Sequence, residues 1–373
     1  MKKPITDKEG FILETIRQNP FISQQELARE LGLSRSAVAG IIAGLIKQGR
    51  ILGRAYMLAE AERVVCIGGA NIDRKARTGG PVELYTSNPV HVHRSFGGVA
   101  RNVAESLGRV GLPAYLMTVV GDDAEGRALF QECEKHGVDL SLSRQLPGFR
   151  TGNYTAILDL SGELFLALAD MEVYEEMTAS MMEANWPRIR NSEVVAVDTN
   201  LPTDALEWMI QRSKAEAVKL CILSVSASKA KRLPKSLVGV DLLIGNREEA
   251  GAMTGGMVHS RQDVESACQE LVRRGVRRVV ITMGPEGAVY LEGQGKAGRV
   301  PPVEAQVRDV TGAGDAFAAG VIAGLCRKLE LETACRIGMA FAKEALESEQ
   351  SVPLALTPAW MQKRWEENHG IHR

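Results

Sequence analysis

The sequence has few of the features that mark membrane, secreted or disulfide-bonded proteins. Aromatic residues make up only 5% of its 373 residues, and no apolar run reaches the roughly 20 residues of a membrane-spanning helix. Because the first residues lack the apolar core of a secretory signal, we expect a cytoplasmic protein without a membrane partner. The six cysteines form no Cys-x-x-Cys pair, which favours reduced core residues over a disulfide or zinc site.

Two common phosphate-binding motifs are also missing. The sequence contains no Gly-x-x-x-x-Gly-Lys-Ser/Thr loop, and its best glycine-rich stretch has Phe317 where the dinucleotide-binding motif has its third glycine. Any phosphate chemistry must therefore use another scaffold.

Length and charge indicate two unequal parts. A chain of 373 residues suggests one α/β domain of roughly 300 residues with a smaller domain attached. Residues 1–58 hold nine Lys and Arg against five Asp and Glu, whereas the remainder is acidic. This asymmetry favours a nucleic-acid contact confined to the first segment.

Residues 1–58 have the pattern of a small helical domain. Apolar spacing predicts helices over residues 7–18, 24–31 and 35–47, followed by a short hairpin over 49–58. The unit resembles a winged helix-turn-helix DNA-binding domain. The resemblance implies that the third helix enters the major groove with Ser34, Arg35 and Ser36, while Arg50 and Arg54 meet phosphates. A docking or dimerisation module is the alternative.

A second domain begins at the buried-strand run Val64 to Ile67. Asp73 follows this run, and carboxylates past a strand's carboxyl end lie where open α/β sheets bind ligands. It could accept hydrogen bonds from two sugar hydroxyls. Further along, Gly97 and Gly98 open a helix, let the backbone approach a ligand closely, and are followed by Asn102 in the first turn.

The stretch from Asp309 to Phe317 is the most informative part of the chain. Gly312, Ala313 and Gly314 at a helix start leave backbone N–H groups unhindered, and the helix dipole adds positive charge there. We therefore predict an anion hole. Asp315 could take the proton from a hydroxyl that attacks a phosphoryl group held in the hole. Alternatively, Asp315 only caps the helix.

Five motifs, taken in order, resemble those of the ribokinase-like, or PfkB, carbohydrate kinases. They are Gly97-Gly98-x-x-x-Asn102-x-Ala104, Gly121-Asp122-Asp123-x-x-Gly126, Asn246-x-x-Glu249, Thr282-Met283-Gly284-x-x-Gly287 and Asp309-x-Thr311-Gly312-Ala313-Gly314-Asp315. The resemblance implies a three-layer α/β/α sandwich over residues 64–373. Segments 74–95 and 150–170 would form a small β-sheet lid, with strands in the alternating runs 82–85 and 90–94.

The resemblance also assigns roles to residues. Asp315 would be the base, and the amides of Gly312, Ala313 and Gly314 would hold the phosphoryl group. The residues implied to bind the sugar are Asn71, Asp73, Gly97, Gly98, Asn102 and Asp170. The residues implied to border ATP are Asn246, Thr282, Gly284, Gly287 and Thr311. Glu249 and Asn246 would hold Mg²⁺ largely through water, and Asp309 would be a ligand of the K⁺ ion that family members often bind.

Softer signals resemble the pseudouridine kinases within this family, among them Gly69-Ala70-Asn71-Ile72-Asp73 and Asp198-x-Asn200. The run Leu223-Ser224-Val225-Ser226 departs from them, because an Asp-Pro pair is common there. We expect an ATP-dependent kinase that phosphorylates the 5′-hydroxyl of a nucleoside, first of all pseudouridine, and that forms a homodimer and binds DNA. A kinase for ribose or a ketohexose, and a ligand-sensing regulator without turnover, are the alternatives.

Overall fold

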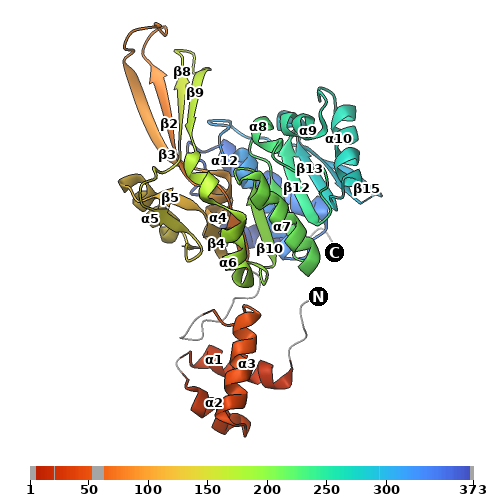
Figure 1. Cartoon of the computed structure of the whole chain (residues 1–373). Coiled ribbons are helices and arrows are strands. Elements are labelled where there is room, and N and C mark those ends of the chain that lie inside the picture. The colour runs from red at the N-terminus through yellow and green to blue at the C-terminus, as the bar shows by residue number, and fades with distance from the viewer. Residues whose placement is uncertain (1–5, 21, 53–62, 294, 370–373) are drawn as a thin grey trace.

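The computed structural model describes residues 6–20, 22–52, 63–293 and 295–369, which form a small helical domain and a larger α/β domain (Figure 1). The helices are α1 (Asp7–Gln18), α2 (Gln24–Leu31), α3 (Arg35–Lys47), α4 (Val99–Arg109), α5 (Ala124–Lys135), η1 (Glu172–Glu176), α6 (Ala179–Ile189), α7 (Thr203–Glu216), α8 (Ala227–Ala230), α9 (Arg247–Thr254), α10 (Arg261–Arg273), η2 (Gly284–Glu286), α11 (Ala313–Cys326), α12 (Leu331–Leu346) and α13 (Pro358–His369). The strands are β1 (Val64–Ile67), β2 (Asn71–Thr78), β3 (Val90–Gly97), β4 (Ala114–Met117), β5 (Val119–Gly121), β6 (Val138–Asp139), β7 (Arg144–Leu146), β8 (Asn153–Leu158), β9 (Leu164–Asp170), β10 (Val194–Asp198), β11 (Leu220–Leu223), β12 (Val240–Asn246), β13 (Arg278–Thr282), β14 (Ala288–Glu292) and β15 (Lys296–Val300).

The three helices of the first domain begin and end as the sequence predicts. Ser23 and Glu26 form a capping box before α2, Gly32 ends that helix in the left-handed conformation, and the Ser34 hydroxyl caps α3. The apolar faces meet in one core that includes Ile12, Leu27, Val38, Ile42 and Leu45. Most of the predicted hairpin, including Arg54, lies outside the described residues.

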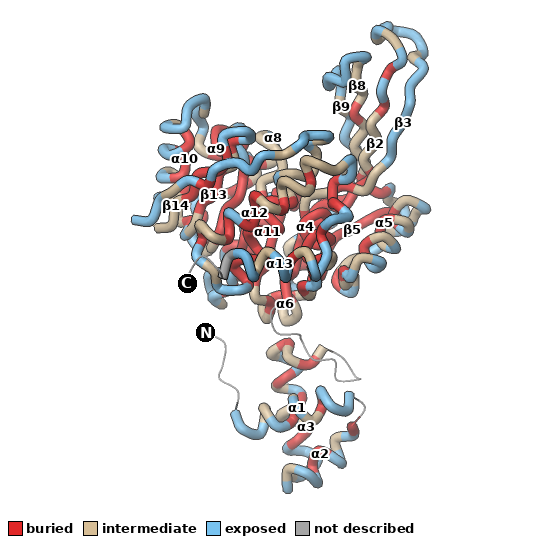
Figure 2. Tube along the Cα trace, turned by 180° about the vertical axis from the view of Figure 1, so that it is seen from behind, coloured by how far each residue is buried: buried red, intermediate tan, exposed pale blue. Residues whose placement is uncertain are grey.

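The larger domain is a three-layer α/β/α sandwich, as predicted. Its main sheet has the order β15-β14-β13-β12-β11-β10-β1-β4-β6, and its strands are parallel except at the β14 and β15 pairings. Side chains alternate between the two faces. Val64 and Cys66 join a core with α4, α11 and α12, whereas Val65 and Ile67 join a core with α6, α7 and α10. Helices cover both faces, so the strands of this sheet are largely buried (Figure 2).

A second sheet, with the order β3-β2-β8-β9, projects from the carboxyl end of the main sheet (Figure 1). The expected strand over residues 82–85 is wrong. There the Asn88 side chain bonds the backbone of Glu83 in both directions at 2.8 Å and closes a turn. The first strand of this sheet is instead β2, which contains Asp73. Asp73 therefore lies within a strand and not in a loop that follows β1.

The helical domain contacts the end of α6. Arg190 donates a 2.8 Å hydrogen bond to the Lys47 carbonyl, and Asn191 donates one to the Gln48 carbonyl. Gly49, with φ +69°, lies against Pro187 so closely that any Cβ there would collide with the Pro187 carbonyl. This contact requires glycine at position 49.

All six cysteines are buried and unpaired, which confirms their expected place in the core. Among the described helices, none has the length and apolar character needed to cross a membrane.

Candidate functional site

The start of α11 has the geometry of an anion-binding site. Gly312 is the residue before the helix, has φ +81°, and lies against Ser351, where a Cβ would collide. No side chain caps this end of the helix among the described residues, and the Ala313 amide makes only a long 3.4 Å contact with the Val310 carbonyl. These amides can therefore donate to an anion.

A cleft of about 350 Å³ connects this helix start with several predicted residues. It is lined by Val99, Leu223, Ser224, Val225, Ile244, Gly245, Asn246, Glu249, Thr282, Val310, Gly312, Gly314, Asp315 and Ala318. Two of the predicted anion-hole residues, Gly312 and Gly314, thus share one cavity with the predicted base, the predicted Mg²⁺ ligands and Thr282. Ser224 and Val225 lie in it too.

Asp315 is partly buried in the first turn of α11. Burial raises its pKa to about 7; a hydrogen bond from Asn102 opposes this shift, and the nearby Asp198, Asp73 and Glu249 add to it. The Asn102 amide donates to the Asp315 carboxylate at 2.7 Å. A carboxyl group with a pKa near neutrality suits a general base.

Asn102 makes contacts that the sequence did not indicate. Its amide nitrogen contacts Asp315, and its oxygen accepts a 2.7 Å hydrogen bond from buried Arg101. Arg101 also donates to the Phe96 carbonyl at 2.6 Å. The bonds with Asp315 and Arg101 fix the Asn102 side chain on the carboxylate of Asp315, so Asn102 can orient that carboxylate in addition to its predicted contact with the sugar.

Asp73 and its neighbours form a second polar group at the base of the lid. Asn71 donates to the Asp73 carboxylate at 2.6 Å, and that carboxylate packs on Gly97 so that a Cβ at residue 97 would collide with it. Burial raises the pKa of Asp73. Gly98, with φ +99°, lies in the same way against the Gly69 carbonyl. Because they lack a Cβ, the two glycines leave room for the Asp73 carboxylate and the Gly69 carbonyl.

Asp198 is a buried carboxylate to which sequence reasoning assigned no structural role. It is fully buried at the end of β10, and its carboxylate accepts from the amides of Gly69 at 2.8 Å and Ala100 at 3.1 Å. It thereby joins the loop before Asp73 to the start of α4. Its position at the carboxyl end of a buried strand was the available signal.

Glu249 folds back on Asn246 in a capping box at the start of α9. Its carboxylate accepts from the Asn246 backbone at 2.9 Å and side chain at 3.0 Å. Glu249 is buried, and burial raises its pKa to about 7. Glu249 and Asp315 bring two carboxylates to one cleft, and clustered oxygens of this kind fit Mg²⁺.

The remaining predicted residues lie outside the cleft or at its edge. Asp170 is exposed at the end of β9, opposite Asn153. Gly284 and Gly287 both have positive φ at the turn around η2 but do not line the cleft. Asp309 and Thr311 precede the anion hole, and both accept hydrogen bonds from Lys75 of the lid, a contact that the sequence did not indicate.

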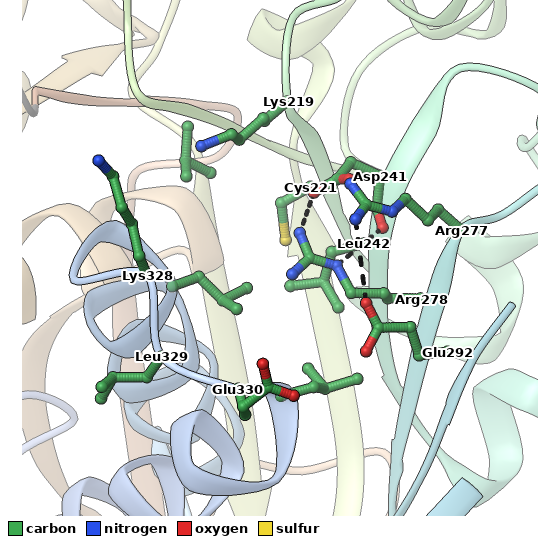
Figure 3. A pocket seen from close by; sticks show the side chains of 13 residues that line it. Lys219, Cys221, Asp241, Leu242, Arg277, Arg278, Glu292, Lys328, Leu329 and Glu330 are labelled. Atoms are coloured by element: carbon green, nitrogen blue, oxygen red, sulfur yellow. Dashed lines mark hydrogen bonds and ion pairs between the residues drawn. The ribbon is translucent and has the colours of Figure 1, made fainter. Parts of the chain in front are cut away.

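A separate hollow of about 250 Å³ lies where the parallel strands begin (Figure 3). Its charged side chains largely pair with one another, because Asp241 binds Arg277 at 3.0 Å and also binds Arg278. None of the predicted site residues lines it. The predicted site residues instead gather in the cleft beside α11.

In the helical domain, Ser34, Arg35 and Ser36 are exposed at the start of α3. The Ser34 hydroxyl accepts from the Ala37 amide at 3.2 Å, and the hydroxyls of Ser34 and Ser36 lie 3.0 Å apart. Arg50 donates to the Gln48 side chain at 3.3 Å. Arg35 is thus the exposed cation of this helix start.

Comparison with known proteins gives consistent matches. Residues 61–357 match the pfkB family carbohydrate kinase, and residues 11–51 match a winged helix-turn-helix DNA-binding domain. An uncharacterized sugar kinase, YeiI, of Escherichia coli K12 is 30% identical over 338 residues, which cover 91% of this chain and 93% of that protein. A pseudouridine kinase of the same organism is 32% identical over 264 residues, which cover 71% of this chain and 84% of that protein.

The fold agrees with solved structures. A carbohydrate kinase from Agrobacterium tumefaciens superposes with a TM-score of 0.70 at 29% identity, over 82% of this chain and 97% of that one. The α/β sandwich, the lid and the ordered motifs point the same way. The chain therefore belongs to the pfkB family of carbohydrate kinases, and its kinase domain is preceded by a winged helix-turn-helix domain.

Proposed function

We propose that this kinase transfers a phosphoryl group from ATP to the 5′-hydroxyl of a nucleoside, with pseudouridine as the preferred acceptor. The observation that carries the proposal is the position of Asp315 in the first turn of α11, beside uncapped amides and held by Asn102. Base and anion hole thus share one turn of chain.

The residues of the cleft support an in-line displacement. The amides of Gly312, Ala313 and Gly314 bind the transferring phosphoryl group and stabilise its negative charge. Asp315 accepts the proton of the attacking hydroxyl, whose oxygen then forms the bond to phosphorus as ADP leaves. Asp73 and Asn71 orient the sugar from the base of the lid, and the lid excludes water.

Mg²⁺ fits the cleft because Glu249 and Asp315 bring carboxylate oxygens to it. When bound with ATP, such an ion neutralises charge on the phosphate oxygens. Glu249 and Asn246 would hold it through water, while Thr282 and Thr311 would border the nucleotide.

The acceptor is argued from the relatives. The pseudouridine kinase at 32% identity covers most of the kinase domain and favours a nucleoside. Relatives named ribokinase, 24% and 26% identical, keep a non-nucleoside sugar as the alternative. A coupled ADP-release assay over nucleosides and sugars tests this directly. We expect the highest kcat/KM for pseudouridine, and a higher value for ribose or fructose would overturn the nucleoside assignment.

The pH dependence of the reaction should report Asp315. Only the ionised carboxylate accepts a proton, so kcat/KM should fall as the pH drops below about 7, the value to which burial raises the pKa of this group. The hydrogen bond from Asn102 lowers this pKa, so Asn102→Ala should move the acid limb to higher pH. Asn185→Ala, which removes an amide bonded only to the Met181 carbonyl, is the matched control. Superimposable profiles for wild type and Asn102→Ala would contradict this assignment.

We also propose that the helical domain binds DNA. Its family match and the exposed Arg35 at the start of α3 support a contact between this helix and base edges. Ser34 and Ser36 would contribute at the same end, and Arg50 and Arg54 would meet phosphates.

Two arginine variants separate base contacts from phosphate contacts. Arg35→Ala should reduce the preference for a specific site, whereas Arg50→Ala should weaken binding to all duplexes and lower the salt slope by about 1. Anisotropy titrations with promoter and random duplexes at two salt concentrations measure both effects. Full-length protein that shows no salt-dependent duplex binding would make this domain a docking module.

A homodimer is the assembly that we propose. The lid strand β9 exposes Leu164, Leu166 and Leu168 at alternate positions, and β3 exposes Val92. Exposed apolar groups of this kind mark interaction surfaces. Light scattering on the purified chain gives the mass, and a monomer at micromolar concentration would refute the dimer.

A further inference from the structure

Lys75 connects the lid with the loop that precedes the anion hole. It lies on β2, two residues after Asp73 and therefore on the same side of the strand. Its ammonium group lies 2.5 Å from the Asp309 carboxylate and 2.8 Å from the Thr311 hydroxyl. These contacts join residues more than two hundred positions apart, and both side chains of the ion pair are largely shielded from solvent.

The two oxygens of Asp309 are engaged by different partners. One accepts from the Thr311 amide at 2.8 Å, and the other binds Lys75. Burial acts to raise the pKa of Asp309, but the hydrogen bonds from Lys75 and Thr311 outweigh it and lower the pKa. The carboxylate is therefore ionised and already balanced by a cation of this chain.

The same loop is fixed on its other side by the backbone of α12 and the segment after it. The amide of Arg308 donates to the Leu346 carbonyl at 2.8 Å, and Gly312 packs on Ser351. Lys75 is thus the lid residue that bonds this loop, whereas the other contacts named here come from the main domain. Its charge lies next to the residues that begin the anion hole.

A potassium ion at Asp309 does not fit this arrangement. An ion there would share the Asp309 carboxylate with the ammonium group of Lys75. The two positive charges would then be separated only by that carboxylate and would repel each other. The ammonium group carries the same charge as the ion and already donates to one Asp309 oxygen and to the Thr311 hydroxyl.

We propose that Lys75 is a built-in substitute for the monovalent cation, so that this kinase orders its anion hole without potassium. Lys75 is a positioning residue: it acts on phosphoryl transfer through Asp309 and Thr311. Because it comes from β2, the anion hole is completed only when the lid lies over the site. This inference rests on the proposed kinase activity.

Chemical rescue tests the substitution. Wild type should turn over at about equal rates in chloride salts of K⁺, NH₄⁺, Na⁺ and tetramethylammonium. Lys75→Met should lose roughly 10- to 100-fold in kcat. Removal of an anion-hole donor itself costs about 10²–10³-fold, and Lys75 acts on these donors only indirectly, through Asp309 and Thr311. K⁺ and NH₄⁺ should restore part of this loss, and the bulky tetramethylammonium should not.

Arg77→Met is the matched control, because Arg77 lies on the same side of β2 and bonds only the exposed Leu160 carbonyl. It should behave as wild type. Thermal unfolding supplies a second readout: K⁺ should raise the Tm of Lys75→Met and leave that of wild type unchanged. A wild type activated by K⁺, or a Lys75→Met variant that no cation rescues or stabilises, would overturn the proposal. Wild type without turnover on any acceptor would refute the kinase function instead, and the Tm comparison would still decide whether Lys75 replaces the ion.

Discussion

Asp315→Asn is expected to lose roughly 10²–10⁴-fold in kcat, the usual contribution of a general base. The amide has nearly the same shape as the carboxylate and can keep its contact with Asn102, so neither pocket is emptied. Binding of ATP and of the nucleoside should therefore change only a few-fold. Steady-state kinetics and calorimetric titration of each substrate separate the two effects.

The matched control distinguishes a base from a carboxylate whose charge only stabilises the helix start. Asp263 is the third residue of α10, as Asp315 is of α11, and it bonds the amides of His259 and Ser260 outside the cleft. No side chain caps α11 among the described residues, so the remaining alternative is that the Asp315 charge only stabilises the helix start; Asp315→Asn and Asp263→Asn would then both lower stability slightly and leave kcat alone. An Asp315→Asn variant that keeps more than about a tenth of the wild-type kcat would remove the base assignment.

Local signals in the sequence predicted the helix starts and the family motifs correctly. Ser23 with Glu26 and Ser34 cap helices as expected, because capping depends on residues within one turn. Gly312 adopts the positive φ that a turn into the anion hole requires. The order of the motifs was sufficient to predict the three-layer sandwich.

Contacts between distant segments were not predictable in this way. The bonds from Asn102 to Asp315, from Gly69 to Asp198 and from Lys75 to Asp309 join different elements of the fold. Each bond depends on how the sheets and helices pack. No fixed spacing between residues in one sequence indicates which distant side chains will meet. The first lid strand was missed for a related reason, since pairing of β2 with both β3 and β8 places residues 71–78 in a strand despite their polar composition.

The glycine pair 97 and 98 shows how a correct motif can have an incomplete explanation. The sequence suggested close approach of a ligand, but the structure shows the Asp73 carboxylate against Gly97 and the Gly69 carbonyl against Gly98. These glycines therefore place the group that we expect to bind the sugar. Substituting Asp73 tests that arrangement.

Asp73→Ala should raise the KM for the nucleoside far more than the KM for ATP. Hydrogen bonds to a charged acceptor contribute about 1.5–3 kcal/mol each, so loss of two sugar hydroxyl contacts corresponds to roughly 10²–10⁴-fold. Asp73 also accepts from Asn71, so Asp73→Asn is measured beside it to keep the packing against Gly97. Asp159→Ala removes a carboxylate from the β8–β9 turn of the same lid, where it bonds Ser161 and Glu163, and should leave both KM values unchanged. Equal changes in the KM of both substrates, or a fall in Tm that accounts for the lost activity, would show that Asp73 only supports the fold. If instead both Asp73→Ala and Asp73→Asn raise the KM for the nucleoside alone, the Asp73 carboxylate binds the sugar.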